Sequence, residues 1–214
     1  MISIKNPHFI LSAAGKDGFY KSTLPQFAVA GRSNVGKSSF INCFGNNSKL
    51  ARVSGDPGRT RLINYFDFGP FILTDLPGYG YAKAPKDESK NWDALINDYF
   101  TTENNLAGAI MLVDIRHAPS VLDVALAAYF YKNNIPFIIV ATKSDKLSRA
   151  AIGRQIPVIA STLKVGKDNI IAASSQTGQG RNEILKAIEG LMLSHIAQKK
   201  AERAEAKNSD IAAE

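Results

Sequence analysis

Eight residues near the N-terminus have the types and spacing of a loop that binds phosphate groups. The stretch from Gly31 to Ser38 reads G-R-S-N-V-G-K-S and matches the pattern G-x-x-x-x-G-K-[ST]. Glycines in such a loop let backbone N–H groups turn onto phosphate oxygens, and the helix that follows adds a partial positive charge. Lys37 would then reach the β- and γ-phosphates, and the Ser38 hydroxyl would bind a magnesium ion. The predicted phosphate-binding residues are Gly31, Arg32, Ser33, Asn34, Val35, Gly36, Lys37, Ser38 and Ser39.

Two later stretches offer groups that suit the same phosphates and the same ion. Asp75 and Gly78 belong to a D-L-P-G stretch that follows a predicted strand. The carboxylate there can hold magnesium, directly or through water, while the Gly78 N–H can face a γ-phosphate. Thr60 lies in a long polar loop over residues 46–61, where its hydroxyl would complete the magnesium shell. The predicted binding residues of these stretches are Gly58, Arg59, Thr60, Asp75, Leu76, Pro77 and Gly78.

A fourth stretch, T-K-S-D, has the residue types that recognise guanine. Asp145 can accept two hydrogen bonds, from the guanine N1–H and from its exocyclic amine, and adenine does not offer these donors together. A site built on such buried bonds can reject the wrong partner by about 10⁴–10⁵. The stem of Lys143 can lie across the base, and a backbone N–H of Ser174 or Ser175 can contact the guanine O6. The predicted base-site residues are Thr142, Lys143, Ser144, Asp145, Lys146, Ser174 and Ser175.

Each motif also has a simpler interpretation. The first could be a glycine turn with an unrelated lysine, and D-x-x-G is common where strands end. The stretch 58–61 could be a basic turn, and 142–145 a surface turn of mixed charge. The functional interpretation requires all four stretches to meet at one place.

Strands and helices alternate along the chain in a way that brings the motifs together. Apolar runs predict strands over 8–11, 27–30, 62–68, 71–75, 108–114, 136–141 and 169–173. Helical spacing predicts helices over 39–44, 88–100, 120–133, 148–163 and 182–197, with Pro157 weakening the fourth or marking its start. This alternation favours an α/β fold with a mostly parallel sheet covered on both faces, the strands at 62–68 and 71–75 forming a hairpin. Ligands of such sheets bind at the carboxyl ends of the strands, where the motifs fall.

Length and composition limit the domain organisation, the location and the partners that we expect. The 214 residues, 45% of them hydrophobic, fit one domain over 25–197 with an N-terminal extension and edge strand over 1–24. The charged tail over 198–214 is expected to be disordered or a frayed helix. No apolar run reaches the roughly 18–20 residues of a membrane span, and the start lacks a signal peptide, so we expect a cytoplasmic protein. The single cysteine excludes an intrachain disulfide. A net charge of +7 suits an anionic polymer or a membrane surface, or serves solubility alone.

The ordered set GRSNVGKS, GRT, DLPG, TKSD and SS resembles the translation-factor-related GTPases, and DLPGYGYAK is similar to the bacterial EngB family (also called YihA or YsxC). The resemblance covers residues 8–197 and implies a three-layer α/β/α P-loop GTPase domain with one antiparallel hairpin strand. It further implies GTP and GDP binding, magnesium at Ser38 and Thr60, and a cytoplasmic, monomeric partner of the large ribosomal subunit. Such a protein serves assembly of that subunit and normal cell division. Ser144 stands where the family more often has alanine.

Hydrolysis is the least complete part of the pattern. Many GTPases carry a glutamine directly after D-x-x-G, and here that position is Tyr79, so we expect a low intrinsic rate. The catalytic candidates are Lys37, Thr60 and Asn34. An asparagine at position 34 resembles one that helps to hold a potassium ion beside the phosphates in related GTPases; the alternative is that Asn34 only shapes the loop.

Competing functions remain open at this point. A GTPase acting at the membrane or division septum would also suit a basic chain, but no lipidation signal or convincing amphipathic basic helix is present. A small-molecule kinase would need no guanine motif. The residues Tyr79, Tyr81, Lys83 and Lys86 could contact RNA or pack against the sheet.

Overall fold

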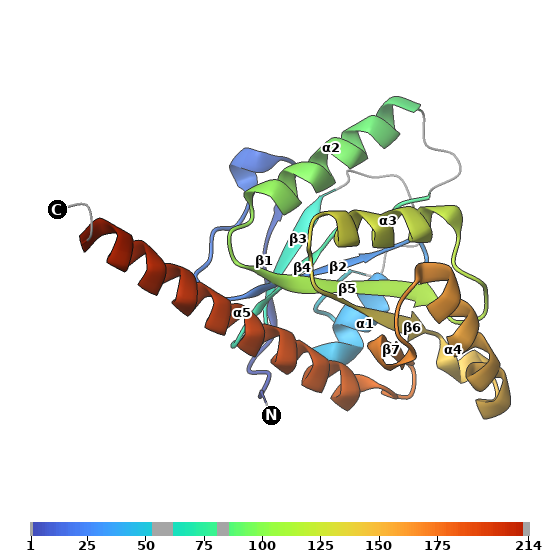
Figure 1. Cartoon of the computed structure of the whole chain (residues 1–214). Coiled ribbons are helices and arrows are strands. Elements are labelled where there is room, and N and C mark those ends of the chain that lie inside the picture. The colour runs from blue at the N-terminus through green and yellow to red at the C-terminus, as the bar shows by residue number, and fades with distance from the viewer. Residues whose placement is uncertain (1, 53–61, 81–85, 212–214) are drawn as a thin grey trace.

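A seven-stranded sheet forms the centre of the molecule (Figure 1). The computed structural model describes residues 2–52, 62–80 and 86–211, and the side chains of these residues apart from 86–93 and 207–211. The strands lie in the order β1-β3-β4-β2-β5-β6-β7. Their bounds are β1 His8–Ala13, β2 Gln26–Gly31, β3 Ile63–Asp67, β4 Ile72–Asp75, β5 Leu106–Asp114, β6 Phe137–Thr142 and β7 Ile170–Ala172.

Strand direction decides where the strand ends meet. Strand β3 pairs antiparallel with both β1 and β4, whereas β2 pairs parallel with β4 and β5, and β6 pairs parallel with β5 and β7. Among the described strands, β3 is therefore the one that runs against the others, as the predicted hairpin requires. The carboxyl ends of β2, β4, β5, β6 and β7 consequently share one edge of the sheet, the edge at which α/β proteins bind ligands.

Helices cover both faces of the sheet, which confirms the predicted three-layer α/β/α fold (Figure 1). Helices α1 and α5 pack on one face, and α2, α3 and α4 on the other. Short 3₁₀ turns occur at Lys16–Gly18, Ser144–Lys146 and Lys167–Asn169. The helices are α1 Lys37–Phe44, α2 Lys86–Thr102, α3 Val121–Lys132, α4 Arg149–Leu163 and α5 Arg181–Ile211.

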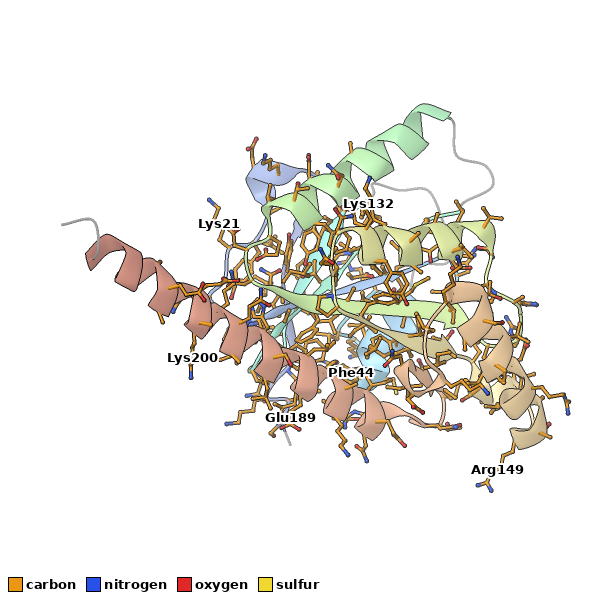
Figure 2. The ribbon with its side chains drawn as sticks, viewed as in Figure 1. Lys21, Phe44, Lys132, Arg149, Glu189 and Lys200 are labelled. Carbon is orange, nitrogen blue, oxygen red and sulfur yellow. The ribbon has the colours of Figure 1, made fainter. Side chains whose placement is uncertain are left out.

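Aromatic side chains fix α1 against the sheet. Phe44 lies near the middle of the molecule (Figure 2), stacked on Phe40 with ring centroids 5.4 Å apart and tilted against Phe68 at 5.7 Å. Both Phe44 and Phe68 are fully buried. Burying such rings stabilises the fold by roughly 1.5–3 kcal/mol each, and here it also fixes the helix that follows the phosphate loop.

The helix predicted over 148–163 is confirmed, whereas the predicted end of the last helix is wrong. Helix α5 does not end at Ala197 but continues to Ile211, because the predicted tail consists largely of alanine, lysine and glutamate, which favour helix. Pro157 does not start a helix; it lies inside α4, which begins at Arg149 after the Ser148 side chain accepts a hydrogen bond from the Ala151 N–H. Burial of apolar residues near its end, such as Ile159, offsets the backbone bond that proline removes.

The first part of the predicted 46–61 loop is held by one side chain. The buried Asn42 amide donates to the carbonyls of Ser48 and Ala51, at 3.1 and 3.0 Å, and its oxygen accepts from the Ala51 N–H at 2.6 Å. Leu50 and Ala51 are buried as a result. Residues 53–61, with the predicted Gly58, Arg59 and Thr60, lie outside the described residues.

Within the part of the chain that is described, no helix is both long enough and apolar enough to cross a membrane.

Candidate functional site

The phosphate-loop pattern forms the turn between β2 and α1. Gly36 has a φ of +105° and Asn34 a φ of +65°, so the backbone makes two left-handed turns between strand and helix. At Gly31 a side chain would lie 2.9 Å from the Leu112 carbonyl oxygen, so only glycine fits. The N–H groups of the first helical turn have no partners in their own helix. Loop and helix end therefore present backbone N–H groups to one anion-binding concavity.

Lys37 folds back over this concavity toward Gly31 and Asp75. Its Nζ lies 3.5 Å from the Gly31 carbonyl oxygen, and a side chain at position 78 would lie 2.7 Å from Nζ. Burial lowers the pKa of Lys37, and the nearby Asp75 carboxylate opposes that effect. The ammonium group is therefore held in a place poor in water, where an added anion would stabilise its charge.

Asp75 ends β4 as a buried carboxylate. Burial raises its pKa to about 6, against the opposing effects of Lys37 and of a hydrogen bond from Asn64. Its Oδ1 has no hydrogen-bond partner among the described residues. An orphan carboxylate oxygen in a buried position needs a reason, and a cation or a bound water would supply one.

These residues fit a magnesium ion. Magnesium prefers hard oxygen ligands and keeps several waters and phosphate oxygens, so it needs only one or two groups from the protein. Ser38, the second residue of α1, offers a hydroxyl, and Asp75 offers the unsatisfied Oδ1. Groups of three or more His, Cys, Asp or Glu side chains that could hold a metal alone are absent from the described residues.

The D-L-P-G stretch touches the phosphate loop directly. The Ser33 N–H donates to the Tyr79 carbonyl at 2.8 Å, and the Ser33 hydroxyl donates to the Gly78 carbonyl at 3.4 Å. A side chain on Gly78 would lie 3.0 Å from the Ser33 nitrogen, so close contact of the two backbones requires glycine there. Pro77 and Leu76 are thereby held beside the loop, with Leu76 buried.

The Tyr79 side chain is buried in the protein and bonded to α3. Its hydroxyl donates to Asp123 Oδ1 at 2.8 Å, and burial raises its pKa well above the usual value. The other carboxylate oxygen of Asp123 accepts from the Ser120 N–H and hydroxyl, both at 2.6 Å, which caps α3. Of the two interpretations left open for this tyrosine, packing is the one observed; Tyr81, Lys83 and the Lys86 side chain lie outside the described residues.

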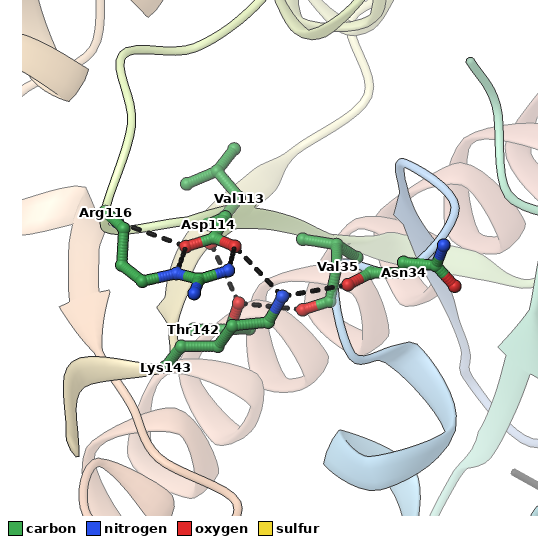
Figure 3. Close-up of polar contacts among 7 residues, drawn as sticks. All are labelled: Asn34, Val35, Val113, Asp114, Arg116, Thr142 and Lys143. Atoms are coloured by element: carbon green, nitrogen blue, oxygen red, sulfur yellow. Dashed lines mark hydrogen bonds and ion pairs between the residues drawn. The ribbon is translucent and has the colours of Figure 1, made fainter. Parts of the chain in front are cut away.

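The T-K-S-D stretch is bonded to the phosphate loop by its first two residues (Figure 3). The buried Thr142 hydroxyl lies 2.9 Å from the Val35 carbonyl oxygen and 3.1 Å from that of Val113. Lys143 Nζ donates to the Asn34 carbonyl at 2.9 Å, while the Asn34 side chain points away from this cluster. The predicted base site and phosphate site are thus one connected structure.

Lys143 is held by a carboxylate at the end of β5. Asp114 Oδ2 lies 2.9 Å from Lys143 Nζ and 2.7 Å from Arg116. Partial burial raises the pKa of Asp114, but hydrogen bonds from Arg116 and Lys143 outweigh that effect and hold the pKa well below its usual range. Asp114 is thus paired with both Arg116 and Lys143 (Figure 3).

Asp145 is positioned by the loop after β7. The Ser174 hydroxyl donates to Asp145 Oδ1 at 2.7 Å, and this bond lowers the pKa of the carboxyl. Lys146 Nζ lies 3.2 Å from Oδ2, an oxygen that accepts no well-aligned hydrogen bond from the described residues. The Ser174 N–H is already used by the Gln179 carbonyl at 3.1 Å, so of the two serines only Ser175 can offer its backbone donor to a base.

Three described residues belong to this site although the motifs did not indicate them: Asp114, Asp123 and Gln179. Asp123 had a signal, because Ser120 and Asp123 have capping-box spacing before an apolar run. Asp114 ends the strand predicted over 108–114, but no motif includes it. Gln179 had no signal, since its role depends on how two distant loops meet.

Comparison with known proteins agrees with this geometry. Residues 26–143 match a family model described as "50S ribosome-binding GTPase". The chain is 44% identical over 189 residues to the "Probable GTP-binding protein EngB" of Pelotomaculum thermopropionicum, covering 87% of this chain and 96% of that protein. The chain belongs to the EngB family of GTP-binding proteins.

A further relative and two solved structures agree with this family and fold. The EngB protein of Streptococcus pneumoniae (strain JJA) is 43% identical over 189 residues, 87% of this chain and 97% of that protein. A crystal structure of a probable GTP-binding protein engB superposes with a TM-score of 0.68 at 24% identity, covering 79% of this chain and 99% of that one. Aquifex aeolicus Era bound to GDP·AlF₄⁻ superposes at 0.61 with 21% identity, over 77% and 56% of the two chains. These two structures support the P-loop GTPase fold.

Proposed function

We propose that this EngB-family protein binds GTP and GDP across the carboxyl edge of the sheet, hydrolyses GTP slowly, and acts as a nucleotide-dependent switch in assembly of the large ribosomal subunit. The observation that carries the proposal is the joining of the two motif regions: Lys143 donates to the carbonyl of Asn34, and Thr142 to that of Val35. A base held at Asp145 and phosphates held at Lys37 would then belong to one ligand.

The roles of the residues follow from their surroundings. The backbone N–H groups of the loop and of the first turn of α1 would hold the phosphates, and Lys37 would neutralise their charge. The Asp145 carboxylate would accept from the guanine N1–H and amine, Lys143 would support the base with its stem, and Ser175 would donate to O6. The proposed ligand contacts are Gly31, Arg32, Ser33, Asn34, Val35, Gly36, Lys37, Ser38, Ser39, Gly58, Arg59, Thr60, Asp75, Leu76, Pro77, Gly78, Thr142, Lys143, Ser144, Asp145, Lys146, Ser174 and Ser175.

Ser38 and Asp75, with Thr60, would hold magnesium. When bound, the ion would supply positive charge beside the β- and γ-phosphates. The orphan Oδ1 of Asp75 supports this assignment. The protein's own contribution to the metal is thus two hydroxyls and one buried carboxylate, a set that suits magnesium better than softer ions.

Slow hydrolysis is supported by the burial of the Tyr79 side chain. Its hydroxyl is bonded to Asp123 and its bulk is buried, so it would not orient a water beside the γ-phosphate. A positive charge supplied from outside would then limit the rate, either from a partner or from a potassium ion near Asn34. Phosphate release measured in potassium and in sodium buffer tests the potassium hypothesis, and equal rates would reject it. If an Asn34→Ala variant kept the faster rate in potassium, Asn34 would not be the residue that holds the ion.

The ribosomal role is supported by the family model's description and by the net charge of +7. Sucrose-gradient sedimentation of cell extract with GTP, GDP or a non-hydrolysable GTP analogue tests it. We expect the protein to migrate with the large subunit in one nucleotide state more than in the others. Absence from ribosomal fractions in every state, with binding to anionic vesicles instead, would favour action at the membrane or septum over assembly in the cytoplasm.

A further inference from the structure

A hydrogen bond between two side chains joins the loops that would recognise the base. The buried Ser144, next to Asp145 in sequence, donates its hydroxyl to Gln179 Oε1 at 3.0 Å. Gln179 comes from the turn after β7, 35 residues away. Its backbone acts on the same turn, because its carbonyl accepts from the Ser174 N–H at 3.1 Å. Gln179 therefore contacts both loops, one through its side chain and one through its backbone.

Both contacts lead to Asp145. Ser174, whose N–H is held by Gln179, donates its hydroxyl to Asp145 Oδ1 at 2.7 Å. Ser144 precedes Asp145 in the same 3₁₀ turn, and its N–H is held by the Ala173 carbonyl at 3.1 Å. The position of the carboxylate is thus set from both sides of a small hydrogen-bonded frame, in which the Ser144–Gln179 and Ser174–Asp145 bonds are made by side chains and the others use the backbone.

The Ser144 hydroxyl is what makes Gln179 necessary. Ser144 is 1% exposed, so its hydroxyl has little access to water and depends on Gln179. Removing one partner of a buried hydrogen bond leaves the other unsatisfied, whereas removing both can be nearly neutral. A serine at position 144 therefore couples an exposed glutamine on a neighbouring turn to the carboxylate beside it.

We propose that Gln179 is a positioning residue for guanine recognition, acting through the Ser144 hydroxyl to hold Asp145 at the angle that its two acceptor bonds require. This inference rests on the proposed function, since it assumes that Asp145 binds the base. Gln179 itself would not touch the nucleotide.

The test compares GDP with IDP, which lacks the exocyclic amine of guanine. The ratio of the two affinities reports the bond from that amine to Asp145, and a general loss of stability cancels because both ligands bind the same folded protein. For Gln179→Ala we expect GDP affinity to fall about fivefold to tenfold and the GDP/IDP ratio to fall about threefold. Gln176→Ala is the matched control, because Gln176 is an exposed glutamine of the same turn whose side chain makes no hydrogen bond to the described residues.

A second pair of variants tests the route through Ser144. In a Ser144→Ala background, Gln179→Ala should change the GDP/IDP ratio by less than twofold, because no hydroxyl is left unsatisfied. Gln179→Glu should keep the wild-type ratio, since a carboxylate oxygen also accepts from the hydroxyl. An unchanged ratio in Gln179→Ala, or an equal loss in both backgrounds, would overturn the proposal.

If Asp145 did not bind the guanine base, the measurements would give a different result. If Asp145→Asn left the preference of GDP over IDP and ADP intact, the base would bind elsewhere and the proposed site would fail. If Asp145→Asn abolished that preference while Gln179→Ala left the ratio at its wild-type value, only the role of Gln179 would be lost.

Discussion

The two halves of the candidate site differ in how closely the protein pairs its charged groups. On the base side, Asp145 Oδ1 accepts from Ser174, its Oδ2 lies beside Lys146 without a hydrogen bond from the described residues, and Lys143 is paired with Asp114. On the phosphate side, Asp75 Oδ1 has no partner among the described residues, and Lys37 is buried with a lowered pKa. One half is built before any ligand arrives, and the other has charges that a ligand would balance.

This difference suggests separate roles, with the base side selecting the nucleotide and the phosphate side responding to its phosphates and metal. A preformed frame around Asp145 costs little to order when a base binds, so it favours specificity in every nucleotide state. Unbalanced charges at Lys37 and Asp75 respond to whichever phosphate and metal are present, and the adjoining Gly78–Tyr79 backbone contacts the same loop. We therefore expect base-side changes to alter which nucleotide binds, and phosphate-side changes to alter how the bound state is stabilised.

The largest effect should come from Asp145→Asn, which tests the base side. An amide replaces one acceptor with a donor, so GDP affinity should fall by about 10²–10⁴, and XDP should become the preferred ligand because xanthine offers the matching acceptor. Competition binding with GDP, XDP and ADP measures this. Unchanged GDP affinity would show that the frame around Asp145 serves structure alone.

Lys37→Ala should have the next largest effect and should not discriminate between bases. Loss of one buried charge-assisted contact is expected to weaken GDP and XDP alike by about 10²-fold, because the lysine would touch phosphate only. Titration calorimetry measures both ligands. Lys49→Ala, which removes an exposed lysine beyond the C-terminal end of α1, should leave both affinities within about twofold.

Asp75 should make the magnesium dependence of GDP binding sensitive to pH. Its folded-state pKa, raised from 3.8 to about 6, means that the folded protein binds this proton more tightly than the unfolded chain does. Without metal, the contribution of Asp75 to the free energy of unfolding should therefore rise as pH falls from about 6 to about 4. Over the same range, the factor by which magnesium raises GDP affinity should fall by up to about tenfold per pH unit below about 6.

Asp75→Asn provides the control for that pH dependence. The phosphates of GDP also titrate near this range, and the variant keeps that contribution while removing the carboxyl. Magnesium enhancement measured at several pH values should be small and flat in Asp75→Asn. A wild-type profile with the same flat shape would mean that Asp75 is no metal ligand.

The smallest effect should come from Tyr79→Phe. Loss of the buried bond to Asp123 should destabilise the protein by about 1–2 kcal/mol and lower its melting temperature by a few degrees, while the hydrolysis rate stays within about twofold. Calorimetric melting and phosphate release check the two parts. Tyr131→Phe removes an exposed tyrosine–carbonyl bond and should shift melting less. A tenfold fall in hydrolysis would place the Tyr79 hydroxyl in the chemistry.

The sequence predicted the sheet, the helices and the convergence of motifs because these depend on local periodicity and on fixed spacing. It did not predict that the Ser174 N–H is used by Gln179, or that Tyr79 bonds to Asp123, since both contacts join residues whose proximity only the folded chain creates. The end of α5 was misjudged from its charge, although its alanines, lysines and glutamates favour helix. Motif matching placed Thr142 in the base site, but it did not indicate that the hydroxyl lies beside the Val35 and Val113 carbonyls.

Helix α5 has 31 residues, which corresponds to roughly 46 Å at 1.5 Å per residue. Met192 is the last of its buried side chains, and the exposed far part, with Lys200, projects beyond the sheet (Figure 2). At its start, Arg181 Nε donates to the Phe44 carbonyl at the end of α1, 3.1 Å away. The start of the helix is therefore joined to the element that follows the phosphate loop. A tilt of about 5° at Arg181 would move its tip by about 4 Å, and a distance measured between a spectroscopic label at its tip and one on the sheet would detect that change.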